Sequence, residues 1–191
     1  VLLFWQAASG QQPWRWYVLG MVFGLALLSK YTAVLMAPCF LLYLLLTDER
    51  RWLKTVHPYA GFVLGLACFA PVLWWNHLHD WVSFTFQARN GLGSQEWALD
   101  KVAEFLSGQA FFSSPFIWCA GLYAAFSAAA RKDKRMLFLV TTSVPVILFF
   151  AVSSLRKTAY PNWASFAYVS FSIWATYFLL AGGGRIRRVV W

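Results

Sequence analysis

Long apolar segments constrain this chain more than any other feature of its sequence. Four of them have about the twenty residues that a helix needs to cross a bilayer: Val56–Trp75, Gln109–Ala130, Met136–Val152 and Ala164–Ala181. A fifth run, Trp16–Leu46, is longer than one crossing requires. An open strand in hydrocarbon would leave backbone N–H and C=O groups unpaired, so helices are expected. We therefore predict an all-α, polytopic transmembrane helical bundle of about five to seven helices.

Composition excludes a soluble domain. The 191 residues are 60% hydrophobic and only 12% charged, whereas soluble domains carry about 25% charged residues. The net charge of +9 could suggest nucleic acid, but the cations lie in short clusters between apolar runs rather than along a polar face. We therefore predict the membrane as a partner and no nucleic acid.

The basic clusters predict how the chain is oriented. Arg50–Lys54, Arg131–Arg135 and Arg185–Arg188 lie on one side of the membrane if each clear span crosses once. Trp16–Leu46 fits this topology as two short helices that meet near Lys30. Eleven of the sixteen Lys and Arg residues then face inward, as the positive-inside rule requires. We predict an integral protein of the inner (plasma) membrane.

Two segments should then face outward, Asn76–Gly108 and Ser153–Trp163. The first is rich in aromatic residues, and its part Glu96–Leu106 predicts an amphipathic helix with Trp97, Val102, Phe105 and Leu106 on one side. The stretch Gly91–Ser94 is expected to form the turn before it. The Gly20/Gly24 and Gly61/Gly65 pairs are predicted to let helices pack closely within the chain.

Outward-facing cations are candidate ligands for a phosphate. Lys30 stands alone among apolar neighbours, so it either marks function or lies at a helix end and reaches the interface. Arg89, Arg156 and Lys157 also face outward, against the general bias, and Arg can bind phosphate through two hydrogen bonds. Each alone could equally be a solvated loop charge.

Other outer residues carry weaker signals. His77, His79 and Asp80 resemble part of a metal site, but two His at i and i+2 share a face only on a strand, and further ligands are not apparent, so polar interface residues are favoured. No metal site is predicted from them. Trp81 and Trp163 could stack on a sugar, although Trp is common at membrane interfaces.

Three stretches resemble a known family: Gly24-Leu-Ala-Leu-Leu-Ser-Lys-Tyr-Thr-Ala33, then Pro71-Val-Leu-Trp-Trp-Asn76 with His79-Asp80-Trp81-Val-Ser-Phe84, and Tyr160-Pro-Asn-Trp163. Together they are similar to bacterial GT-C membrane glycosyltransferases related to protein O-mannosyltransferases and the lipid A aminoarabinose transferase. The resemblance covers nearly the whole chain.

The resemblance implies transfer of a sugar from a polyprenyl-phosphate-linked donor to a lipid, glycan or protein acceptor on the outer face. In this family the acid/base carboxylates lie in the first extracytoplasmic loop. The chain, residues 1–191, is therefore expected to be a single transmembrane domain that lacks this catalytic loop and is inactive alone, so its catalytic base is unknown. The resemblance leaves a divalent metal cofactor open. Lys30 and Tyr31, with Arg89, Arg156 and Lys157, would contact the carrier phosphate.

Two alternatives stay open at this point. A membrane transporter segment would use Lys30 to line a pathway, but Val56–Trp75, Met136–Val152 and Ala164–Ala181 contain no Lys, Arg, Asp or Glu. A non-catalytic membrane scaffold would explain the spans but not the aromatic outer segment.

Overall fold

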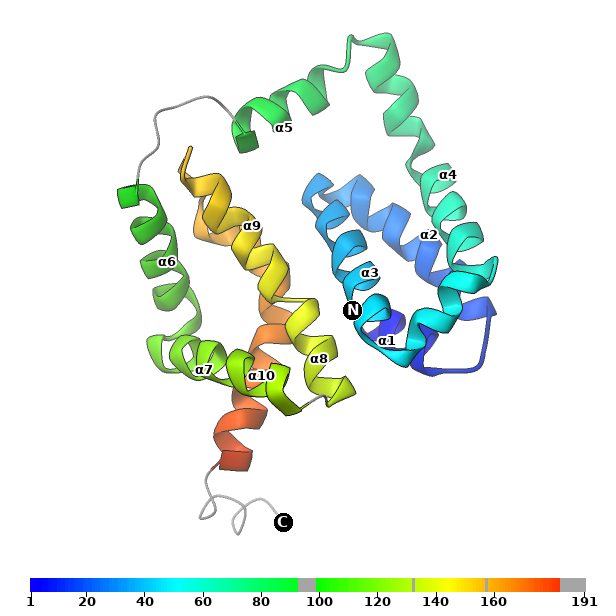
Figure 1. The fold of residues 1–191 in the computed structure, drawn as a ribbon. Helices are drawn as coiled ribbons and strands as arrows, with labels where there is room; N and C mark the ends of the chain where they lie inside the picture. Colours follow the sequence, from blue (N-terminus) through cyan, green and yellow to red (C-terminus); the bar gives the residue numbers. More distant parts are fainter. Residues whose placement is uncertain (93–98, 132, 157, 183–191) are drawn as a thin grey trace. The chain divides into compact units, whose positions relative to one another are not determined.

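The computed structural model describes residues 1–92, 99–131, 133–156 and 158–182, which form helices joined by short turns, with no strand among them (Figure 1). The all-α prediction is confirmed. Contacts divide the chain into two compact units, Val1–Asn90 (unit 1) and Gly91–Trp191 (unit 2). The expectation of a single transmembrane domain stays a prediction.

Unit 1 is built on the two helices predicted within Trp16–Leu46. The first ends at Ser29, Lys30 is extended (φ −153°, ψ 119°), and a 3₁₀ turn leads into the second. The predicted break at Lys30 is thus confirmed. In order, the unit contains α1 (Leu2–Ser9), α2 (Trp14–Ser29), η1 (Tyr31–Leu35), α3 (Met36–Leu46), η2 (Asp48–Lys54), α4 (His57–Leu78) and α5 (Val82–Leu92).

The predicted glycine pairs form the contact between α2 and α4. A Cβ atom on Gly20 would lie 1.8 Å from the carbonyl oxygen of Gly61, and one on Gly24 would lie 2.4 Å from that of Gly65. Because Gly20 meets Gly61 and Gly24 meets Gly65, the two helices run parallel. Their backbones touch at a distance that only glycine permits. The prediction that these pairs serve packing within the chain is confirmed.

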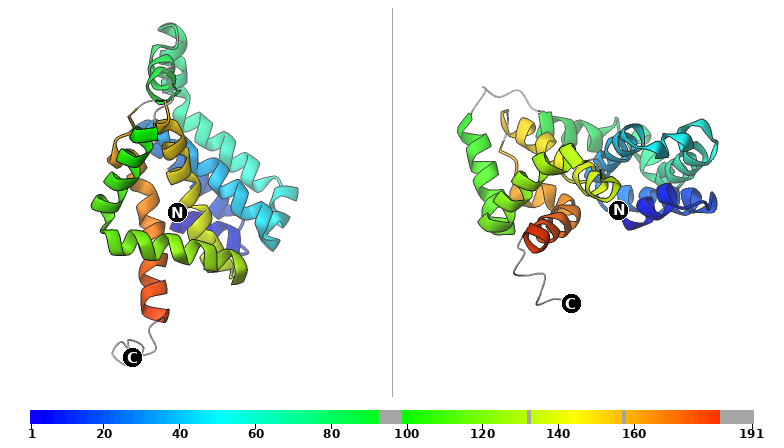
Figure 2. Two further views of the ribbon diagram at one scale, coloured as in Figure 1. Left: turned by 60° about the vertical axis from the view of Figure 1, so that its left-hand side comes forward. Right: turned by 60° about the horizontal axis from the view of Figure 1, so that its bottom comes forward.

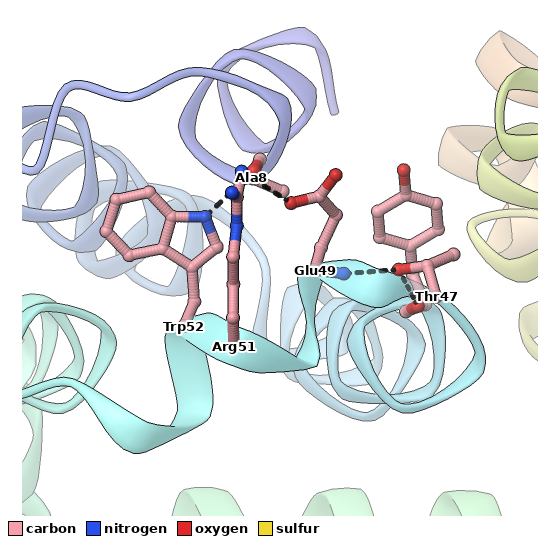
Figure 3. A network of polar contacts seen from close by, with 6 residues as sticks. Ala8, Thr47, Glu49, Arg51 and Trp52 are labelled. Carbon is pink, nitrogen blue, oxygen red and sulfur yellow. Dashed lines mark hydrogen bonds and ion pairs between the residues drawn. The ribbon is translucent and has the colours of Figure 1, made fainter.

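A polar network closes the end of unit 1 where α2 begins and α3 ends (Figure 3). We call this the basic end, because Arg15, Arg50, Arg51 and Lys54 lie there in the sequence. The indole of Trp52 donates to the carbonyl of Ala8 at 2.8 Å. Arg51 pairs with the buried Glu49 at 3.1 Å. Thr47 caps η2 by accepting from the Glu49 N–H at 3.3 Å. The Trp52 bond ties the α3–α4 connection to α1, and the other two contacts hold the connection itself in shape.

Unit 2 packs around the last helix. Phe171, Trp174 and Ala175 are fully buried there, and Figures 1 and 2 show α7 crossing α10. Gly121 allows this crossing, because a Cβ on it would lie 2.2 Å from the Phe171 ring. The elements are α6 (Leu99–Ser113), α7 (Pro115–Arg131), α8 (Lys134–Thr141), α9 (Val144–Ser154), η3 (Pro161–Ala167) and α10 (Tyr168–Gly182).

Two helical segments of the described chain are long and apolar enough to cross a membrane, His57–Leu78 and Lys134–Ser154. They match the predicted spans Val56–Trp75 and Met136–Val152. The pair Tyr31–Leu46 and Asp48–Lys54, bent by 114°, would add a third if it counts as one span.

The predicted span Gln109–Ala130 is wrong as one continuous helix. It is divided at Ser114, whose φ is 78°, between α6 and α7. The residue before a proline is disfavoured in the α conformation, whereas proline itself suits the first turn of a helix. Pro115 therefore ends one helix and starts the next.

The predicted outer segment Asn76–Gly108 is largely helical where the structure describes it. Helix α4 continues to Leu78, and α5 ends at Leu92, so Gly91 is helical. Leu92 of the predicted turn is helical too, and Gly93, Ser94 and Trp97 lie outside the described residues. The predicted amphipathic helix falls within α6, which begins at Leu99; it buries Phe105 and leaves Asp100 and Glu104 exposed. Leu106, which was predicted for the apolar side, is exposed as well.

Candidate functional site

The break between α2 and α3 presents the first two predicted site residues. Lys30 closes α2 by donating its backbone N–H to the carbonyl of Ala26 at 2.9 Å, and its side chain is exposed. Tyr31 is half-buried because its ring stacks on Phe84 (5.6 Å between centroids, 29° between planes) and meets the edge of Phe69 at 5.9 Å. The end of α2 is thereby joined to both α4 and α5.

Asn76 holds the corner between α4 and α5. Its side chain is fully buried, donates to the carbonyl of Val72 at 3.0 Å and accepts from the N–H of Ser83 at 3.1 Å. The backbone carbonyl of Asn76 accepts from the backbone N–H of Trp81 at 2.8 Å. Asp80 and Trp81 both have positive φ, 50° and 56°, a conformation that costs free energy for residues other than glycine. The amide of Asn76 therefore stabilises a tight corner that presents Trp81.

Aromatic rings gather at this end of unit 1, which we call the Lys30 end. Phe84 contacts Tyr31 on one side and Trp81 on the other, at 5.8 Å. Phe69 lies 6.4 Å from Phe84. We call Tyr31, Phe69, Trp81 and Phe84 the outer aromatic cluster. Trp81 is 45% exposed, so the cluster offers an open ring beside the end of α2.

The two histidines of the corner contact neighbouring residues of the same corner. His79 donates its Nδ1–H to the carbonyl of Trp75 at 2.8 Å and stacks on the Trp75 ring at 4.1 Å. His77 lies against Trp81 at 6.1 Å. Among the residues that the structure describes, no three His, Cys, Asp or Glu side chains are grouped so as to hold a metal ion.

The predicted site residues are divided between the two units. Lys30, Tyr31, Trp81 and Arg89 belong to unit 1, where Phe84 connects Tyr31 with Trp81 and Arg89 is exposed on α5. Arg156 and Trp163 belong to unit 2, and Lys157 lies outside the described residues.

In unit 2 the two predicted residues flank the turn after α9. Arg156 is exposed just beyond the end of that helix and donates its backbone N–H to the carbonyl of Ser153 at 3.1 Å. Trp163 is half-buried and packs on Phe150 (6.0 Å) and Tyr160 (5.7 Å). Its packing supports the turn, and part of its surface stays open.

Gln109 anchors the Tyr160–Trp163 segment, a role that sequence reasoning missed. Its fully buried amide donates to the carbonyl of Pro161 at 3.1 Å and accepts from the hydroxyl of Tyr168. Pro161 also lies against Gly108, where a Cβ would come within 2.7 Å of its Cγ. Like Asn76, Gln109 is an amide beside apolar residues, and that isolation was the available signal, because a buried amide requires partners.

Comparisons with known proteins support the resemblance seen in the motifs. Residues 1–75 match the family model described as dolichyl-phosphate-mannose-protein mannosyltransferase. The chain is 30% identical over 168 residues to the lipid A galacturonosyltransferase RgtD of Rhizobium johnstonii, covering 85% of this chain and 34% of that protein. The chain thus spans about a third of the length of this curated relative. No solved structure gives a significant match.

Proposed function

The chain is related in sequence to GT-C-like membrane glycosyltransferases, and from this premise we propose that it forms part of an enzyme that transfers a sugar from a polyprenyl-phosphate-linked donor. The acceptor would be a lipid, glycan or protein at the outer face of the membrane. The relative's name supports a lipid acceptor, because that protein is named for lipid A and for galacturonic acid.

The observation that carries the proposal is the Lys30 end of unit 1. There an exposed ammonium follows the last turn of the apolar helix α2, beside an aromatic cluster with one open ring. A polyprenyl phosphate lies at the membrane interface and gains negative charge as the sugar departs. A cation at that interface stabilises this charge, and an aromatic face suits the apolar side of a sugar ring.

The remaining residues receive roles within the same proposal. Lys30 and Tyr31 contact the carrier phosphate, and Arg89, Arg156 and Lys157 supply further positive charge at the outer interface. Trp81 and Trp163 contact the sugar or the acceptor. The carboxylate that activates the acceptor hydroxyl is assigned to a part of the enzyme outside this chain.

The test measures sugar transfer by the full-length enzyme in vesicles, with purified lipid A as acceptor. Polyprenyl-phosphate galacturonic acid, mannose and aminoarabinose serve as donors. Lys30→Ala is expected to lower kcat/KM by about 100-fold, the effect of removing one group that stabilises developing negative charge. Lys30→Arg should retain most activity, because it keeps the charge. Lys54→Ala, at the basic end, is the matched control and should leave the rate unchanged.

Two results would overturn the proposal. If Lys30→Ala transfers sugar as fast as the unmodified enzyme, Lys30 does not contact the leaving phosphate. If no donor supports transfer while labelled substrate crosses the vesicle membrane, the chain is part of a transporter.

A further inference from the structure

The corner between α4 and α5 has an unfavourable backbone at two consecutive residues. Asp80 and Trp81 are both left-handed, with φ of 50° and 56°. A helix that ends in this way usually places glycine at the left-handed position. The conformation costs free energy for any other residue, and a residue as bulky as tryptophan rarely adopts it. The corner thus keeps two side chains where glycine would suit the backbone better.

Hydrogen bonds around the corner hold this backbone in place. The backbone carbonyl of Asn76 accepts from the backbone N–H groups of His79 at 3.1 Å and of Trp81 at 2.8 Å. The side-chain carbonyl of Asn76 accepts from the N–H of Ser83 at 3.1 Å. All of these bonds would form equally well with glycine at position 80, because none of them uses the Asp80 side chain. The corner therefore does not explain why an aspartate stands there.

The carboxylate of Asp80 is exposed, and it has no hydrogen-bond or ion-pair partner within the part of the chain that the structure describes. It is also the one carboxylate of unit 1 outside η2, which carries Asp48 and Glu49. A side chain that costs backbone free energy and contacts no other group does not stabilise the unit. Its role is therefore to be sought in what it binds.

The neighbouring Trp81 supplies an apolar surface beside this carboxylate. Its ring contacts His77 at 6.1 Å and Phe84 at 5.8 Å and is still 45% exposed. Consecutive Cα atoms are about 3.8 Å apart, so one sugar ring can reach both side chains. The C–H face of a sugar suits the open indole. A carboxylate only accepts hydrogen bonds, so it suits the hydroxyl or ammonium groups at the sugar's edge.

We propose that Asp80 selects the sugar that the enzyme transfers. The sugar ring lies on Trp81, and the carboxylate of Asp80 accepts hydrogen bonds from hydroxyl or ammonium groups at the edge of the ring. A sugar with a carboxylate of its own is rejected, because two like charges would meet. This inference rests on the proposed function and narrows it. The donor carries a neutral or amino sugar and not a uronic acid, unlike the sugar for which the curated relative is named.

The test compares three polyprenyl-phosphate donors, which carry mannose, aminoarabinose or galacturonic acid, with the full-length enzyme in vesicles and lipid A as acceptor. The unmodified enzyme should show a kcat/KM for mannose or aminoarabinose at least about tenfold above that for galacturonic acid. Asp80→Asn removes the charge but keeps a residue that tolerates the left-handed backbone. It should lower kcat/KM for the preferred donor about tenfold, because a charge-assisted hydrogen bond is lost. It should use galacturonic acid at least as well as the unmodified enzyme does.

Three further variants separate this role from phosphate binding and from stability. Asp100→Asn removes an exposed carboxylate from α6 and should leave the ratios among the donors unchanged. Lys30→Ala should lower transfer from all three donors by the same factor, because they share the carrier phosphate. Asp80→Gly should raise the melting temperature, because glycine adopts the left-handed conformation freely. It should nevertheless narrow the donor preference as Asp80→Asn does.

Several results would overturn the inference and leave the proposed function standing. One is a preference of the unmodified enzyme for galacturonic acid, and another is an equal change with all three donors in Asp80→Asn. A lower melting temperature for Asp80→Gly would also contradict it, because the carboxylate would then stabilise the corner. Transfer from none of the donors would instead refute the proposed function, and the inference with it.

Discussion

Two buried amide side chains, Asn76 and Gln109, organise the turns at which the candidate site residues lie. Each uses both its side-chain N–H and its side-chain carbonyl oxygen. Asn76 joins α4 to α5, and Gln109 joins α6 to η3 and α10. In apolar surroundings an unpaired amide group is costly, so such residues specify one arrangement of their neighbours. They connect the packing of each unit to the position of Trp81 or Trp163.

Replacing Asn76 by Ala should destabilise the corner between α4 and α5. The N–H of Ser83 and the carbonyl of Val72 would each lose a side-chain partner, at a cost of about 1–3 kcal/mol for the group left unsatisfied. The apparent melting temperature of the full-length protein in detergent measures the loss. Gln87→Ala, at an exposed site on α5, should have no effect; an equal loss in both variants would contradict this role of Asn76.

Gln109 and Tyr168 should behave as a coupled pair. Gln109→Leu leaves the Tyr168 hydroxyl and the Pro161 carbonyl without this partner, and Tyr168→Phe removes the other side of one bond. In a double-mutant cycle on thermal unfolding, the double variant should be about 1 kcal/mol more stable than the sum of the single losses predicts. Strictly additive losses would show that the bond contributes nothing to stability.

At the scale of elements, backbone contact rather than side-chain interdigitation sets the spacing of α2 and α4. The two glycine pairs place carbonyl oxygens where any Cβ would stand. Because lipid offers no hydrophobic gain for helix association, close van der Waals contact is what holds such helices together. The same contact fixes the register of α2 against α4, so Tyr31, just after α2, meets Phe69.

Gly61→Leu should therefore disrupt unit 1. Its Cβ would lie 2.2 Å from the carbonyl oxygen of Trp16, which forces the helices apart. Overpacking of this kind costs about 1–3 kcal/mol or more. Ala67→Leu adds a side chain of equal size to the exposed face of α4 and should be tolerated. Thermal unfolding of the two variants checks the difference, and equal stability would show that the helices do not touch at Gly61.

At the scale of the whole chain, the distribution of charge predicts the topology. Eleven of the sixteen Lys and Arg residues fall on the side assigned to the cytoplasm, and the positive-inside rule depends on such short basic segments. Within unit 1 the basic end and the Lys30 end lie at opposite ends of α2 and of α4, as this topology requires.

Cysteine labelling of the full-length protein in intact cells checks the orientation. The native Cys39, Cys68 and Cys119 are first replaced by Ala, and a single cysteine is placed at Arg89 or at Lys54. A membrane-impermeant maleimide should label Arg89→Cys in intact cells, whereas Lys54→Cys should react only after lysis. The reverse pattern would place the Lys30 end in the cytoplasm and exclude the proposed outer-face reaction.

The sequence alone determined the features that depend on local composition. Apolar segments of sufficient length become helices in lipid because each helix satisfies its own backbone, and an isolated Lys30 in such a run marks a helix end. Glycines at a spacing of four predicted a close helix contact. The break at Ser114 was missed because the apolar run continues across it, although Pro115 was the signal for it.

Only the tertiary structure decided which residues meet. Tyr31 and Trp81 are joined through Phe84, and Gln109 reaches Pro161 and Tyr168, across separations that no local pattern encodes. The burial of the Trp16 indole likewise results from the packing of Phe4 and Trp52 against it. The physical reason is that hydrophobicity and backbone pairing act along a single helix, whereas side-chain partners and cavities depend on how several helices fit against one another.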